Sequence, residues 1–144
     1  MLAVIGAAVP WTIRARAQAK TPIEVFKDPS CDCCHLWVNH MNANGFVAKV
    51  RDTDMTPIKT RYGIPLKLQS CHTAVVEGFV IEGHVPAADV RTLLGRKPKG
   101  IVGLTIPGMP ASAPGMDLKP FQPYTVLTFD RAGKTAVFAQ HDRV

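Results

Sequence analysis

The stretch PIEVFKDPSCDCCHLWVNHM, residues 22–41, combines a strand, a turn and the beginning of a helix. Residues 22–27 predict the strand, and Asp-Pro-Ser at 28–30 predicts the turn. The apolar residues that follow recur at i, i+3, i+4 and i+7, which is the spacing of one helical face: Cys34, Trp37, Val38 and Met41. The sequence therefore predicts a strand followed directly by a helix that has three cysteines at its start.

Further strands and helices are expected up to residue 95. The predicted strands are 46–52, 73–76 and 79–82, and the predicted helices are 56–62 and 86–94, with Gly95 after the second. This order, βαβ, helix, β-hairpin and helix, is that of a minimal thioredoxin-like domain. We therefore expect an α/β fold with a mixed sheet over residues 20–97.

Residues 98–144 differ in composition. Six prolines between residues 98 and 123 predict that no regular element forms there. Residues 124–129 and 134–139 then predict two strands of a hairpin. We interpret this region as a Pro-rich and β-hairpin extension of the same domain, because it is too small to hold a core of its own.

Length and charge narrow the classes of function. A chain of 144 residues predicts one domain, and its net charge of +6 includes no dense basic run. This charge is typical of a soluble surface and does not favour nucleic-acid binding. No coiled-coil pattern is present, so we expect a monomer.

The first 19 residues predict a secretory signal peptide. Residues 2–13 are almost wholly apolar, and small-x-small patterns occur at 15–17 and 17–19. No basic residue precedes the apolar run, and an uncleaved anchor is the alternative. Export would place the mature chain in the periplasm, which is an oxidising compartment. The processed chain would then have no stable membrane span.

Four cysteines form the candidate site. Cys31 and Cys34 have the C-x-x-C spacing of a redox motif after a strand, and a helix N-terminus stabilises thiolates there. They are the candidate catalytic pair. Cys33 adds a third thiol. Cys71 lies in the loop before a predicted strand, and in thioredoxin-like folds this loop faces the C-x-x-C. Two alternatives remain open: a redox pair with a spare buried thiol, and a disulfide between Cys71 and Cys31 or Cys34.

Histidines and methionines extend the set of soft donors. Cysteine and methionine suit Cu(I), and imidazole accepts copper in either oxidation state. Zinc needs only four ligands, and this chain offers more soft donors than that, so we expect copper. Beyond the cysteines, the candidate ligands are His35, His72, His84, His141, Met109 and Met116. Each has an alternative role, such as capping for His84 or a tail residue for His141. We expect His40 at the surface and Met41 in the core.

Four motifs of this sequence are similar to those of a known protein family. Cys-x-Cys-Cys-His at 31–35, SCHTA at 70–74, EGHVPA at 82–87 and PGMP at 107–110 resemble the copper-resistance protein CopG of Gram-negative bacteria. The resemblance covers residues 21–141. It implies a periplasmic thioredoxin-like protein whose extension helps bind metal. It also implies a cysteine-bridged site for more than one copper ion, with Cys31, Cys33, Cys34 and Cys71 as thiolate ligands.

Three functional hypotheses follow. The resemblance implies a copper-resistance protein that interconverts Cu(I) and Cu(II). The C-x-x-C alone would suffice for a metal-free thiol–disulfide oxidoreductase. A passive carrier that hands copper to a periplasmic efflux system is the third.

Overall fold

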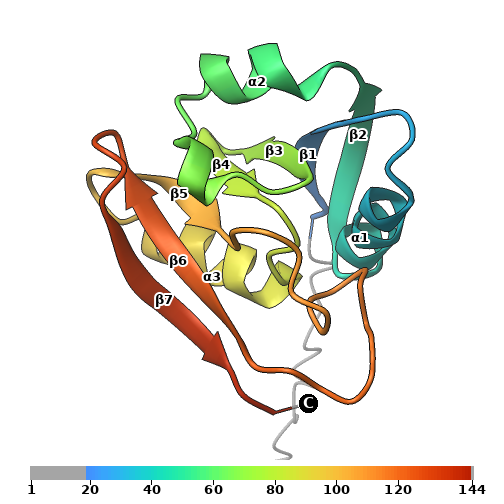
Figure 1. Ribbon diagram of the computed structural model, residues 1–144. Helices are drawn as coiled ribbons and strands as arrows, with labels where there is room; N and C mark the ends of the chain where they lie inside the picture. The colour runs from blue at the N-terminus through green and yellow to red at the C-terminus, as the bar shows by residue number, and fades with distance from the viewer. Residues whose placement is uncertain (1–18, 144) are drawn as a thin grey trace, which may run out of the picture.

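The computed structural model describes residues 19–143, which form a seven-stranded mixed sheet with helical segments on both faces (Figure 1). The predicted signal peptide, residues 1–19, lies outside the described residues except for Ala19. None of the described helices combines the length and the hydropathy that crossing a bilayer requires.

The sheet has the strand order β2-β1-β3-β4-β5-β6-β7. β1 and β2 are parallel, as are β4 and β5, and every other neighbouring pair is antiparallel. The strands are β1 Thr21–Lys27, β2 Phe46–Asp52, β3 His72–Val76, β4 Phe79–Glu82, β5 Ile101–Thr105, β6 Tyr124–Asp130 and β7 Thr135–His141. The expected α/β fold with a mixed sheet is confirmed, as is the C-terminal hairpin.

Helices α1 (Asp32–Ala43) and α3 (Ala87–Arg96) pack on one face of the sheet. Their buried side chains form the main core with alternate residues of the central strands, including Val25, Ala74 and Ile81. The opposite face carries α2 (Met55–Arg61), the 3-10 helix η1 (Leu66–Leu68) and a smaller apolar cluster: Ile64, Leu68, Val80 and Phe129. The two faces are therefore covered by different parts of the chain.

Strand β5 contradicts the expectation that no regular element forms between residues 98 and 123. It occupies a proline-free window, and Gly103 at its centre weakens the local signal for a strand. The glycine is needed because a Cβ at this position would overlap the backbone oxygen of Val80 on β4. The close approach of β4 and β5 therefore requires glycine at this position, and glycine lacks the side chain that would have indicated β5 in the sequence.

Helix α3 is longer than predicted. It continues through Gly95 to Arg96 and ends at Lys97, whose φ is +43° and whose N–H donates to the oxygen of Leu93 at 2.8 Å. Lysine thus takes the left-handed position that usually favours glycine.

Candidate metal site

The three helix cysteines are placed by the turn between β1 and α1. Asp28 closes this turn, because its side chain accepts from the N–H of Ser30 at 2.8 Å and its backbone oxygen accepts from the N–H of Cys31 at 3.1 Å. Cys31 is the N-cap residue of α1. The sulfur-bearing residues therefore occupy the first turn of the helix.

Cys31 and Cys34 form a disulfide, with their Cα atoms 5.4 Å apart. Cys34 is fully buried, whereas Cys31 and Cys33 are partly buried. The Sγ atom of Cys33 lies 3.6 Å from that of Cys31, and Cys33 is a free thiol. Cys31 and Cys34, the residues with the C-x-x-C spacing, are thus bonded to each other in this structure.

Cys71 joins these residues from the position directly before β3. The sulfur atoms of Cys31, Cys33, Cys34 and Cys71 all lie within 4.8 Å of one another. Cys71 is free, so it is not part of the structural disulfide that the sequence left open. The fold thus gathers four sulfur atoms from two elements.

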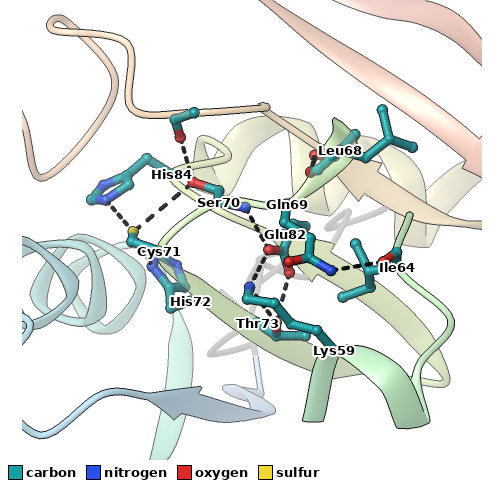
Figure 2. Close-up of polar contacts among 12 residues, drawn as sticks. Lys59, Ile64, Leu68, Gln69, Ser70, Cys71, His72, Thr73, Glu82 and His84 are labelled. Carbon is teal, nitrogen blue, oxygen red and sulfur yellow. Dashed lines mark hydrogen bonds and ion pairs between the residues drawn. The ribbon is translucent and has the colours of Figure 1, made fainter. Parts of the chain in front are cut away.

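Two imidazoles face Cys71. Its Sγ lies 3.2 Å from Nδ1 of His72 and 3.1 Å from Nε2 of His84, which Figure 2 shows on two sides of the sulfur. Nδ1 of His84 lies 2.7 Å from the oxygen of Pro114, so this nitrogen donates its hydrogen there. That hydrogen bond leaves the lone pair of Nε2 directed at Cys71.

Burial sets the protonation of this group. It raises the pKa of Cys71 to about 12, with a further rise caused by Cys33. It also lowers the pKa of His84, and it lowers the pKa of His72 well below the usual value. The metal-free site therefore holds a neutral thiol and two neutral rings whose lone pairs are available to a cation.

Trp37 connects α1 to these histidines. Its Nε1 donates to the oxygen of Val85 at 2.9 Å, and its ring centroid lies 4.4 Å from that of His72. Trp37 is fully buried. It holds the cysteine helix against His72 and against the residue that follows His84.

The segment between β5 and β6 covers the site. Figure 1 shows this orange segment reaching α1. A Cβ on Gly115 would lie 2.7 Å from the nitrogen of Trp37 and 3.1 Å from the oxygen of Cys33. The hydroxyl of Ser70 donates to the oxygen of Gly108, which attaches the segment to the residue before Cys71.

The remaining candidates are more dispersed. His35 is exposed on α1, Met109 is 55% exposed in the covering segment and Met116 is half-buried there. Nε2 of His141 lies 2.7 Å from Oδ2 of Asp89. In residues 19–143 neither His35 nor His141 belongs to a group of three or more clustered His, Cys, Asp or Glu donors.

Two further expectations concerned α1. Met41 is fully buried in the core, as predicted. His40 was expected at the surface, but it is half-buried, and its Nε2 accepts from the N–H of Ala87 at 3.1 Å. The first N–H groups of α3 need acceptors, and a neighbouring helix supplies one here, which sequence spacing does not reveal.

The chain is similar to solved structures and to a family model. A structure named copper resistance protein CopG, form 1, is 40% identical, has a TM-score of 0.79, and is aligned over 85% of this chain and 98% of its own length. The chain belongs to the CopG copper-resistance family. The structure of form 2 gives 40% identity, the same coverage and a TM-score of 0.78.

The family described as protein of unknown function, DUF411, matches residues 68–116, which carry Cys71, His84 and both methionines of the covering segment. A comparison with curated proteins finds no match.

The donors suit the metal named by the CopG relatives. Thiolate and imidazole are ligands that copper accepts, and thiolate in particular favours Cu(I). The ring of His72 is fully buried, and its Nε2 has no hydrogen-bond partner among the described residues, so the protein alone does not satisfy it. These residues fit copper, and the family and the cysteine cluster together support a copper-related role.

One buried feature of this region is not apparent from the sequence pattern. A buried ion pair between Lys59 and Glu82 lies behind the Cys71 loop (Figure 2). A carboxylate at the end of the apolar strand β4 is the signal that could have indicated it.

Proposed function

We propose that this chain is a periplasmic copper-binding protein that holds Cu(I) and Cu(II) during copper resistance and converts one into the other. The observation that carries the proposal is the group of four sulfur atoms within 4.8 Å of one another, with two imidazoles against Cys71. The thiolate ligands are Cys31, Cys33, Cys34 and Cys71, and the imidazole ligands are His72 and His84. The apolar leader pattern of residues 1–19 supports export.

Cys31 and Cys34 provide the redox step. Their conversion from two thiols to the disulfide releases two electrons and two protons, and reduction of two Cu(II) ions to Cu(I) consumes those electrons. Because the thiolate is the metal ligand, disulfide formation also removes two ligands from the site. Copper binding and the oxidation state of the pair are therefore linked.

More than one copper ion fits this arrangement. Cys71 belongs both to the four-cysteine group and to a second group with His72 and His84. A thiolate sulfur has several lone pairs and can bridge two ions. Met109 and Met116 lie in the covering segment, where thioethers would add soft donors, and His35 would add an imidazole at the rim.

Anaerobic titration of the reduced protein with Cu(I), followed by native mass spectrometry, tests the site. We expect more than one Cu(I) per chain, and fewer for Cys33→Ser and for Cys71→Ser. Met55→Leu removes a sulfur from α2, outside both donor groups, and should bind as much copper as the wild type. Equal stoichiometry in all four proteins would overturn the proposal, and equality for Cys33→Ser alone would remove Cys33 from the site.

The disulfide favours one second candidate, a metal-free thiol–disulfide oxidoreductase. Cys31 is partly exposed at the N-cap of α1, where an attacking thiolate can reach its sulfur. Insulin reduction that persists after substitution of both Cys33 and Cys71 would favour this activity over copper chemistry.

A passive carrier that delivers copper to an efflux system uses the same ligands. It would show no change in the spectrum of the copper-loaded protein when reductant is added. A change in the spectrum, together with oxidation of Cys31 and Cys34 by Cu(II), would support redox conversion.

A further inference from the structure

Glu82 is a fully buried carboxylate at the end of β4. It forms an ion pair with Lys59 of α2, which is also buried. Its Oε2 accepts from the hydroxyl of Thr73 at 2.6 Å, and its Oε1 accepts from the N–H of Ser70 at 2.7 Å (Figure 2). The polar contacts of its side chain are therefore directed at α2 and at the chain around Cys71.

The end of β4 and the residue after it hold the peptide on both sides of Cys71. Ser70 precedes it and is held through its N–H by Glu82. His72 follows it, and its oxygen accepts from the N–H of Gly83 at 3.0 Å. Glu82, the last residue of β4, and Gly83, which follows it, thus anchor the two neighbours of the thiol.

The same strand end also determines the position of His84. This residue follows Gly83 directly, and its Nε2 lies 3.1 Å from the sulfur of Cys71. The backbone oxygen of Glu82 accepts from the N–H of Ile106 at 3.1 Å, which connects this strand end to the beginning of the covering segment. Glu82 therefore lies where the Cys71 loop, His84 and the covering segment meet.

A contribution to the stability of the fold does not by itself explain why a buried carboxylate occupies this position. Desolvation of a buried ion pair offsets much of its Coulombic attraction, and apolar residues of similar volume often stabilise a fold equally well. An apolar side chain, however, offers no acceptor to the N–H of Ser70 or the hydroxyl of Thr73. The property that only a polar residue supplies here is the hydrogen bond to the Cys71 loop.

We propose that Glu82, which is paired with Lys59, is a positioning residue whose carboxylate oxygen fixes Cys71 and His84 at the spacing the copper site requires. This inference rests on the proposed copper function. It assigns Glu82 no contact with the metal, because the carboxylate acts through its hydrogen bonds with Ser70 and Thr73.

Two matched double variants separate the acceptor from the charge. Glu82→Gln with Lys59→Met removes both charges, and the amide oxygen can still accept from Ser70. Glu82→Met with Lys59→Met also removes both charges but leaves Ser70 without its acceptor. Glu24→Gln removes a carboxylate from an exposed ion pair with Arg51 and serves as the control.

Two measurements are made on each protein in the reduced state. Iodoacetamide labelling of the metal-free protein, resolved by mass spectrometry, compares the rate at Cys71 with that at Cys33. Competition with the chromophoric chelator bicinchoninate gives the Cu(I) affinity. We expect the Met/Met variant to label faster at Cys71 and to bind Cu(I) about 10-fold to 100-fold more weakly, whereas the Gln/Met variant and the control match the wild type.

Other outcomes would overturn the assignment. Equal Cys71 labelling and Cu(I) affinity in the two double variants would show that the hydrogen bond to Ser70 positions nothing. If the Met/Met variant does not fold, Glu82→Asp replaces it, because the shorter side chain keeps a charge for Lys59 but recedes from Ser70; unchanged labelling and affinity there would refute the proposal. If no protein binds copper, the proposed function fails, but the labelling comparison still decides the role of Glu82.

Discussion

Gly115 offers a direct test of how the covering segment is seated on the thiol site. Its φ of +88° lies in the left-handed region, and an added Cβ would lie 2.7 Å from the nitrogen of Trp37 and 3.1 Å from both the oxygen of Cys33 and Nδ1 of His84. Two of these atoms are helix backbone and cannot move without disturbing α1. Gly115→Ala should therefore push the segment off the helix and away from His84.

Two costs add in this variant. A left-handed backbone costs a residue with a Cβ about 1–2 kcal/mol, and an extra methyl group in a packed site costs about 1–3 kcal/mol. The free energy of unfolding of the metal-free protein should therefore fall by about 2–5 kcal/mol.

Gly108 provides the matched control, because its φ is +71° and an added Cβ would meet nothing within 4 Å. The free energy of unfolding of Gly108→Ala should therefore fall only by the backbone cost, which is about 1–2 kcal/mol.

Urea unfolding followed by circular dichroism measures both variants. Cu(I) affinity is the second assay, because displacing the segment removes the hydrogen bond from His84 to Pro114. We expect weaker copper binding for Gly115→Ala than for Gly108→Ala. Equal losses of stability in the two variants would refute the reasoning, since only one of them has atoms in the way.

Two further predictions concern histidines. Burial lowers the pKa of His40, His72 and His84, so the unfolded chain takes up protons first as the pH falls. The metal-free protein should lose stability below about pH 6.5, and a flat urea-unfolding profile between about pH 7.5 and about pH 5.5 would contradict this. His141→Ala removes the hydrogen bond with Asp89 and should cost about 1 kcal/mol. Its Cu(I) stoichiometry should equal that of the wild type, and a lower value would make His141 a ligand.

Local patterns predicted most of the fold. The spacing of Trp37, Val38 and Met41 predicted α1, because a helix with one buried face repeats its apolar residues in this way. The β3–β4 hairpin was predicted around Glu77 and Gly78, and both residues have positive φ values there. Apolar spacing and turn residues depend only on neighbours in the sequence, so they can be recognised without the structure.

The failures arose where distant segments meet. β5 was missed because Gly103 lacks the side chain that would mark a strand, and the reason for the glycine is Val80 on another strand. His40 was misplaced because its partner, the N–H of Ala87, lies far away in the sequence. The Lys59–Glu82 pair was overlooked for the same reason.

The sequence by itself determined that three thiols stand at the start of a helix that follows a strand, because strand, turn and helix are each specified by adjacent residues. Only the tertiary structure decided which residues complete the site. Pairing of β1 with β3 sets His72 opposite Lys27, and this register brings Cys71 to the first turn of α1. The hydrogen bond from His84 to Pro114 then orients the imidazole toward the sulfur. Strand register and hydrogen bonds between remote segments are properties of the packed chain, so no local pattern could have specified them.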